Sequence, residues 1–204
     1  MFTTDPAVLD EVVKAYDVRG TVPDQINPEV AYALGVGFAR FCQGAGAVDR
    51  IVVGRDMRSS GPDLVDAFAR GVMEQGIDVV DVGLASTDLV YYASGTLDAP
   101  GAMFTASHNP AQYNGVKLCL SGARAVGIDT GLDKVKAVAA DVLRGKGPAV
   151  SARAGSLTER DLLQQFADHV VSFVDVSSLR PLRVVADTAN GMGGFVVPAV
   201  FERL

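Results

Sequence analysis

The sequence contains no tryptophan, and only two cysteines and two histidines among its 204 residues. Cys42 and Cys119 are too few for a disulfide framework and lack the spacing of metal ligands. We therefore expect both to be small buried residues in a reducing compartment.

The chain also lacks an excess of positive charge and a long apolar run. Its 18 Lys and Arg residues are scattered among 24 Asp and Glu residues, for a net charge of −6. This excludes a broad electrostatic footprint for nucleic acid or an anionic membrane, although a small basic pocket is compatible with it. No stretch approaches about 18 uninterrupted apolar residues, and acids stand where a secretory signal has a basic region. We expect a cytoplasmic protein that binds neither nucleic acid nor membranes.

Apolar residues make up 49% of the chain, which is enough for a substantial core. Short apolar runs predict strands, and apolar residues at helical spacing predict helices. In chain order we expect a strand at 15–20, a helix from 28 to about 44, a strand at 50–53, a helix at 62–75, a strand at 77–82, a helix from 87, a strand at 101–105 and a helix at 129–143. This alternation indicates an α/β fold, a three-layer α/β/α domain with a mixed, mainly parallel sheet. The strand around Lys117 follows too short a loop for a parallel crossover, so it should run antiparallel to its neighbour or lie at the edge.

A second, similar domain is expected to start near the C-terminal end of the sequence. The segment Gly145–Gly155 is rich in Gly, Pro, Ala and Ser, which is typical of a linker. We predict a first domain over 1–145, a linker over 146–157 and the incomplete start of a second domain over 158–204. The capping-box-like residues from Thr158 predict a helix through about Val174, and a buried strand is expected over Arg183–Ala186. These elements cannot bury a sheet by themselves.

A serine and a histidine end the apolar run of 101–105. Asn109-Pro110 forces a turn directly after Ser107 and His108, and ligands of α/β sheets usually bind at such carboxyl ends of strands. Lys117 follows on the next strand. A serine, a histidine and a lysine at one end of a sheet suit the handling of a phosphoryl group. The alternative is that Ser107 and Asn109 only cap a turn.

A serine hydrolase does not fit these residues. There is no Gly-x-Ser-x-Gly elbow. Ser107 and His108 are adjacent on what we take to be an extended turn, so their side chains should point apart, and His108 is then poorly placed to deprotonate the serine. His169 lies inside the helix predicted from Thr158, where we interpret it as a partly exposed helix residue.

Two arginine-containing turns allow two interpretations each. Arg19, at the end of the first strand, suits phosphate recognition, or else is a surface residue paired with Asp17. The turn over 54–61 contains Asp56 and Arg58 before a helix. It suits either anion binding at the helix N-terminus or an Asp–Arg network that shapes the loop.

The segment Thr105–Pro110, followed by Tyr113-Asn114-Gly115 and Lys117, closely resembles the phosphoserine loop of the α-D-phosphohexomutases, the phosphoglucomutase and phosphomannomutase family. Further segments resemble that family's landmarks in order and spacing, and together they span nearly the whole chain: Lys14–Gly20, Gly54–Arg58, Gly83 with Thr87, and Asp187–Gly194. Two of these segments, Lys14–Gly20 and Tyr113-Asn114-Gly115, are more similar in sequence to the bacterial phosphomannomutase/phosphoglucomutase branch than to the phosphoglucosamine branch. Ala85-Ser86-Thr87 departs from the pattern, since many members have a proline before the threonine.

The resemblance implies a serine that donates a phosphoryl group to a hexose monophosphate and recovers one from the resulting bisphosphate. Such chemistry depends mainly on positioning and on cations around the transferring group. The roles it implies are these: Ser107 carries the phosphoryl group, His108 and Lys117 assist with protons and charge, and Arg19, Tyr16 and Asn109 bind substrate.

The resemblance also implies Mg²⁺ and a hexose 1,6-bisphosphate as cofactor and intermediate, and hexose phosphates as partners. Ser107, through its phosphate, would supply one metal ligand. Members of the family have four domains, and their metal loop contains alternating aspartates, whereas this chain contains no Asp-x-Asp. We therefore expect a fragment that is inactive by itself. The alternatives are a non-catalytic fragment that binds sugar phosphates or proteins, and the phosphoglucosamine mutase branch.

Overall fold

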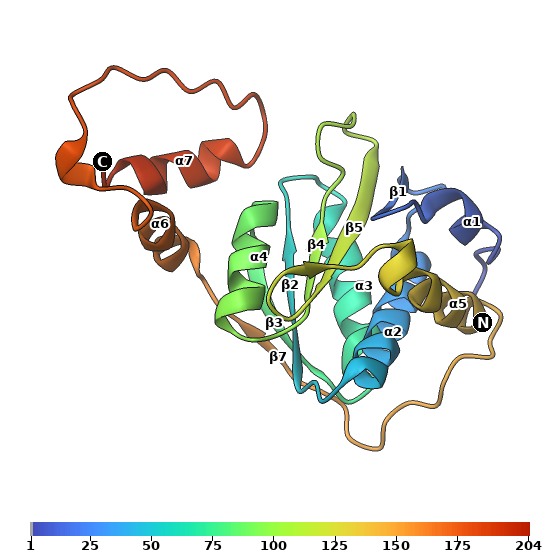
Figure 1. Ribbon diagram of the computed structural model, residues 1–204. Coiled ribbons are helices and arrows are strands. Elements are labelled where there is room, and N and C mark those ends of the chain that lie inside the picture. The colour runs from blue at the N-terminus through green and yellow to red at the C-terminus, as the bar shows by residue number, and fades with distance from the viewer. Residues whose placement is uncertain (1) are drawn as a thin grey trace.

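One mixed sheet forms the centre of the computed structural model, which describes residues 2–204 (Figure 1). Its strand order is β1-β5-β4-β2-β3-β7, and β6 pairs with β5. The strands are β1 (Val18–Thr21), β2 (Arg50–Arg55), β3 (Asp78–Leu84), β4 (Gly101–Phe104), β5 (Tyr113–Leu120), β6 (Arg124–Ala125) and β7 (Leu157–Glu159). The helices are α1 (Val8–Val12), α2 (Pro28–Ala45), α3 (Gly61–Met73), α4 (Thr87–Thr96), α5 (Leu132–Leu143), α6 (Leu163–Val171) and α7 (Gly193–Phe201).

The strand directions confirm the predicted α/β class. β2 runs parallel to both β3 and β4 in the middle of the sheet, and β5 runs antiparallel to β4 and β1. Of the two alternatives predicted for the strand around Lys117, the antiparallel direction is therefore confirmed, and the edge position is not, because β5 lies between β1 and β4. Because β4 and β2 are parallel, the segments that follow Phe104 and Arg55 leave the sheet at the same edge.

Helices cover both faces of the sheet, giving three layers (Figure 1). On one face α2, α3 and α5 enclose a core that contains Phe38, Phe68 and Phe104. On the other face α4 and α6 pack over a smaller cluster with Val52, Val90 and Met103. Burial of one such large apolar side chain is worth about 1.5–3 kcal/mol, so the first face supplies most of the stability. Among the described residues, none of these helices combines the length and the apolarity needed to cross a membrane.

Local signals explain where α2 begins and how closely it packs. The Asn27 side chain accepts a hydrogen bond from the backbone N–H of Val30 at 3.0 Å, and a proline follows at the first helical position. A Cβ atom added to Gly35 would lie 2.2 Å from the backbone oxygen of Phe68 on α3. Glycine at this position therefore lets the backbones of α2 and α3 approach each other.

The helix predicted to start at Thr158 starts later. Residues Leu157–Glu159 form β7, which pairs in parallel with β3, and the Thr158 hydroxyl donates to the backbone oxygen of Val79 at 3.4 Å. The predicted helix is therefore wrong over its first residues. The unpaired edge of β3 supplies hydrogen-bonding partners that a local capping pattern does not reveal. The division of the chain into domains stays a prediction.

The buried strand predicted over Arg183–Ala186 is also wrong. These residues form no strand and are exposed, with Val185 at 95%. A β-branched run forms a strand only where another strand can pair with it, and none does so within residues 2–204.

Candidate active site

The loop between β4 and β5 presents Ser107 at the carboxyl end of β4. The Ser107 side chain is exposed, and its backbone φ of 54° lies in the left-handed region. Its N–H donates to the Thr105 hydroxyl at 3.0 Å. A non-glycine residue in this region costs about 1–2 kcal/mol, so surrounding contacts must hold Ser107 there.

The hydroxyl of Ser107 lies 3.2 Å from Nδ1 of His108. The expectation that these side chains point apart is wrong, because the backbone at Ser107 is left-handed and not extended. With its proton on Nε2, the imidazole of His108 is able to accept the hydroxyl proton.

Two cations meet a buried carboxylate beside this loop. Asp17 precedes β1 and is 2.6 Å from Nη2 of Arg19 and 3.2 Å from Nζ of Lys117. Nη1 of Arg19 also donates to the side-chain oxygen of Asn109 at 2.7 Å. The antiparallel pairing of β1 with β5 aligns Arg19 with Gly115, which brings these groups together. The predicted pairing of Arg19 with Asp17 is therefore confirmed, whereas its role in phosphate recognition stays a prediction.

Tyr16 lies next to one of these two cations, Lys117. Its side chain is 68% exposed, and Nζ of Lys117 is 5.3 Å from the centre of its ring. A cation at this distance is attracted to the ring face. The tyrosine is thus available to contact a ligand next to Lys117.

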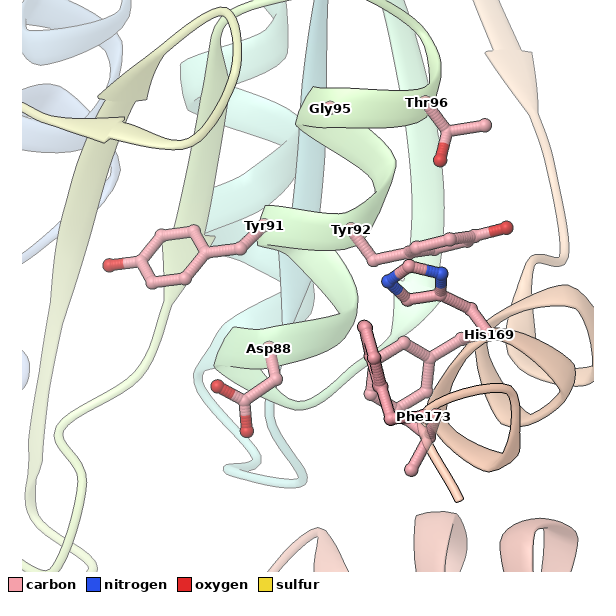
Figure 2. A pocket seen from close by; sticks show the side chains of 9 residues that line it. Asp88, Tyr91, Tyr92, Gly95, Thr96, His169 and Phe173 are labelled. Carbon is pink, nitrogen blue, oxygen red and sulfur yellow. The ribbon is translucent and has the colours of Figure 1, made fainter. Parts of the chain in front are cut away.

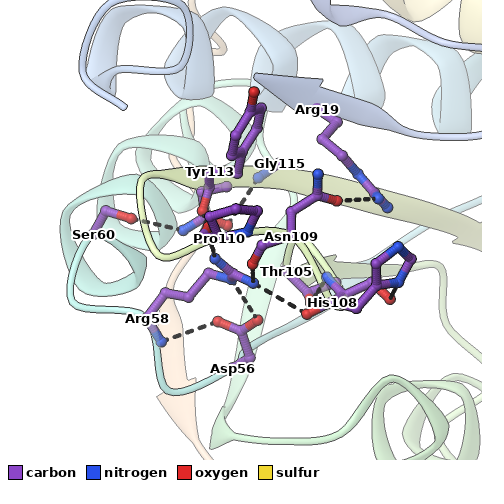
Figure 3. A network of polar contacts seen from close by, with 12 residues as sticks. Arg19, Asp56, Arg58, Ser60, Thr105, His108, Asn109, Pro110, Tyr113 and Gly115 are labelled. Atoms are coloured by element: carbon purple, nitrogen blue, oxygen red, sulfur yellow. Dashed lines mark hydrogen bonds and ion pairs between the residues drawn. The ribbon is translucent and has the colours of Figure 1, made fainter. Parts of the chain in front are cut away.

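A third cation, Arg58, lies beneath the loop. It forms an ion pair with Asp56 at 3.2 Å, and both side chains are nearly fully buried. Figure 3 shows its guanidinium directed at the backbone of the loop that contains His108, Asn109 and Pro110. The interpretation of the 54–61 turn as an Asp–Arg network is therefore confirmed.

A cavity of about 800 Å³ separates Ser107 and His108 from the segment Thr188–Gly191. The sequence singled out Asp187–Gly194 but did not predict its position opposite the serine. Arg58 and Asn109 also line the cavity, whereas Arg19, Tyr16 and Lys117 do not. The predicted site residues therefore fall into two groups: the loop itself, and a cationic group beside it that is joined to Asn109.

A second hollow lies away from this site, between α4 and α6 (Figure 2). The ring of His169 packs between Tyr92 and Phe173, with ring centres 4.9 and 4.8 Å away. His169 is exposed on α6, as predicted for a partly exposed helix residue. Ser107 is not among the described residues that line this hollow, so His169 belongs to a different cavity from the serine.

The described residues do not form a complete metal site. Within residues 2–204, no three or more His, Cys, Asp and Glu side chains are grouped so that they could hold a metal ion. Cys42 and Cys119 are buried and free, as predicted. Burial raises the pKa of the Cys42 thiol to about 12 and also raises the pKa of Cys119, so neither is a reactive thiolate near neutral pH.

Comparisons with known proteins agree on one family. The model of the phosphoglucomutase/phosphomannomutase alpha/beta/alpha domain I matches residues 10–142. A phosphomannomutase from Escherichia coli is 37% identical over 192 residues, which cover 93% of this chain and 41% of that protein. A protein from Xanthomonas campestris described as phosphohexose mutases is 40% identical over 194 residues, which cover 94% of this chain and 41% of that protein. The crystal structure of a phosphoglucomutase/phosphomannomutase family protein from Burkholderia thailandensis is similar, with a TM-score of 0.82 and 31% identity, and covers 99% of this chain and 42% of that one. The chain thus spans about two fifths of the length of the curated relatives it matches.

Proposed function

Because this chain belongs to the phosphoglucomutase/phosphomannomutase family, we propose that it supplies the serine-bearing first domain of a phosphohexomutase that interconverts hexose 1-phosphates and 6-phosphates. The observation that carries this proposal is the position of Ser107. Its exposed hydroxyl lies at a strand end, 3.2 Å from His108 and beside a cavity of about 800 Å³. A serine in this setting suits transient phosphorylation.

Phosphoryl transfer to Ser107 needs one bond to form and one to break. Oγ of Ser107 attacks a phosphorus of the hexose bisphosphate, its proton passes to Nδ1 of His108, and the bond from phosphorus to the sugar oxygen breaks. The sugar oxygen takes a proton from water, and the protonated His108 returns its proton to the solvent, so that the imidazole is neutral again. In the reverse direction a sugar hydroxyl attacks the phosphoserine. General acid–base help of this kind is typically worth about 10²–10⁴ in rate.

Lys117 and Arg19 have a charge role in this proposal. The lysine offers a point charge and the guanidinium a planar pair of donors, both of which suit phosphate oxygens. Asp17 holds the two cations at 3.2 and 2.6 Å, which orders them before the substrate arrives.

We propose Mg²⁺ as the cofactor and a hexose 1,6-bisphosphate as the intermediate. A bound divalent ion would offset charge on the phosphoryl group. The described residues would give it only one ligand, the phosphate of Ser107, so the 204-residue chain alone is expected to show no mutase turnover. The check is a coupled assay of glucose 6-phosphate formation from glucose 1-phosphate, run with Mg²⁺ and bisphosphate on this chain and on a full-length enzyme. That enzyme is a protein that contains this sequence and reaches the length of the curated relatives. Comparable turnover in both would contradict this expectation.

The central test is the intact mass of the full-length enzyme before and after incubation with a hexose 1,6-bisphosphate. We expect a gain of one phosphoryl group, mapped by peptide analysis to Ser107. Ser59→Ala is the matched control, because Ser59 is exposed and lines the same cavity. This variant should be phosphorylated as the unsubstituted enzyme is. Phosphate on Ser59, Ser60 or Ser121 in place of Ser107 would refute the proposal.

A further inference from the structure

We propose that Arg58 is a positioning residue for phosphoryl transfer, because its guanidinium holds the serine loop in the backbone conformation that presents the Ser107 hydroxyl. The inference rests on the proposed function, since it concerns the same serine. Arg58 would act on the reaction indirectly, because its guanidinium binds the backbone of the loop from beneath.

The guanidinium of Arg58 uses every N–H group that it has. An arginine carries five such donors. Nε donates to Asp56 at 3.2 Å, Nη1 to the backbone oxygens of Pro110 at 2.8 Å and Tyr113 at 2.9 Å, and Nη2 to those of Ser107 at 3.1 Å and Asn109 at 2.8 Å. Four of the five acceptors are thus backbone oxygens, three of them in the loop and one on Tyr113, where β5 begins (Figure 3).

The partner of Arg58 is itself fixed to the sheet. Asp56 accepts the backbone N–H of Arg58 at 3.1 Å, and its own N–H donates to the backbone oxygen of Phe104 at 2.9 Å. The side chains of Arg58 and Asp56 are only 5% and 6% exposed. The pair therefore joins the end of β2 to the end of β4, directly before the loop.

This arrangement accounts for the unusual backbone of Ser107. Residues other than glycine seldom adopt a φ of 54°. Here both polar groups of the Ser107 backbone are bonded, the N–H to the Thr105 hydroxyl and the carbonyl to Arg58. The same conformation brings the Ser107 hydroxyl to 3.2 Å from His108. Without Arg58, one of these two restraints is lost.

Phosphoryl transfer is sensitive to such a loss. The reaction depends on alignment of the attacking oxygen, and a misplacement of about 1 Å can cost about 10² in rate. Arg58→Lys cannot replace the arginine, because an ammonium group carries three donors and lacks the planar fork. Arg58→Ala leaves a buried space next to Asp56 that free guanidinium ion fits in shape and charge.

The experiment measures kcat, KM and the rate of Ser107 phosphorylation in full-length enzymes with Arg58→Ala and Arg58→Lys. We expect kcat and the phosphorylation rate to fall about 100-fold, with KM little changed, since the lost contact is with the loop and not the substrate. Added guanidinium chloride, at concentrations too low to denature, should restore part of the rate in Arg58→Ala and saturate. Arg40→Ala is the matched control. Arg40 is an exposed arginine on α2, and its removal should change neither the rate nor the response to guanidinium.

The outcomes separate this inference from the proposed function. An unsubstituted enzyme that takes up no phosphate on Ser107 would overturn both. A phosphorylated unsubstituted enzyme, with both Arg58 variants near its rate, would overturn the positioning role alone. Loss of folded structure in both variants, seen by circular dichroism, would also overturn it and make Arg58 a residue of stability only.

Discussion

Two arginines contact the serine loop, and they differ in how many of their N–H groups are used. Arg58 has all five engaged, and its side chain is 5% exposed. The Arg19 side chain is 21% exposed, bonds to Asp17 and Asn109, and keeps a buried Nε with no partner among the described residues. A fully bonded guanidinium fixes structure, whereas one with unused donors can bind a ligand.

The largest effect is expected from Ser107→Ala, which removes the group that both arginines are proposed to serve. Mutase turnover of the full-length enzyme should fall to background, because no hydroxyl remains to accept the phosphoryl group. The unfolding midpoint should hardly change, since a loop-tip hydroxyl contributes little to the core. Enzyme assays and thermal unfolding measure the two effects. Substantial turnover would show that neither arginine acts through this serine.

The comparison itself is tested by the stability of Arg58→Ala against that of Arg19→Ala. Arg58→Ala leaves the charge of Asp56 buried and unpaired, which should lower the free energy of unfolding by about 3–5 kcal/mol. Arg19→Ala leaves Asp17 with Lys117 as a partner, so its loss should be on the order of 1 kcal/mol. Urea unfolding followed by circular dichroism gives both values. Equal losses would mean that the two arginines do not differ in structural role.

Lys117→Met tests whether the cations next to Asp17 act on the ligand, as proposed for Arg19. Lys117 and Arg19 both form an ion pair with Asp17. The rate of phosphoryl transfer should fall about 100-fold, while the free energy of unfolding changes by less than about 1 kcal/mol. Single-turnover phosphorylation and urea unfolding measure the two. If turnover were unchanged and stability fell sharply, Lys117 would belong with Arg58 as a structural residue.

The smallest effect is expected from Asn27→Ala. This variant lowers stability through contacts outside the serine loop, so it shows how much a loss of stability alone changes the turnover measured for the two arginine variants. The variant removes the N-terminal cap of α2, a bond of 3.0 Å to Val30, and should cost about 1 kcal/mol of stability. Turnover at 25 °C should equal that of the unsubstituted enzyme. A marked fall in turnover would show that lost stability alone lowers activity, and the Arg58 results would then need that correction.

Features set by nearby residues were predictable from the sequence, and features set by distant ones were not. The apolar spacing predicted a helix from residue 28, where α2 begins, and the short loop before Lys117 predicted a strand that is antiparallel or at the edge. The contact between Ser107 and His108 was missed because the backbone of Ser107 depends on an arginine 49 positions earlier in the chain. The strand β7 was missed because it forms on an edge that β3 provides. Of the site, the loop residues were predicted, whereas the position of Thr188–Gly191 across the cavity was not.

The pairing of β7 with β3 also limits how far α6 can move from the sheet. If residues 146–162 were one free tether, about 17 extended residues could reach about 60 Å from α5. With Leu157–Glu159 fixed in the sheet, only Arg160–Leu162 remain before α6, and three residues reach about 10 Å. The pivot for a swing of α6 relative to the sheet is therefore this short segment, and the Gly- and Pro-rich stretch before β7 adds nothing to that range.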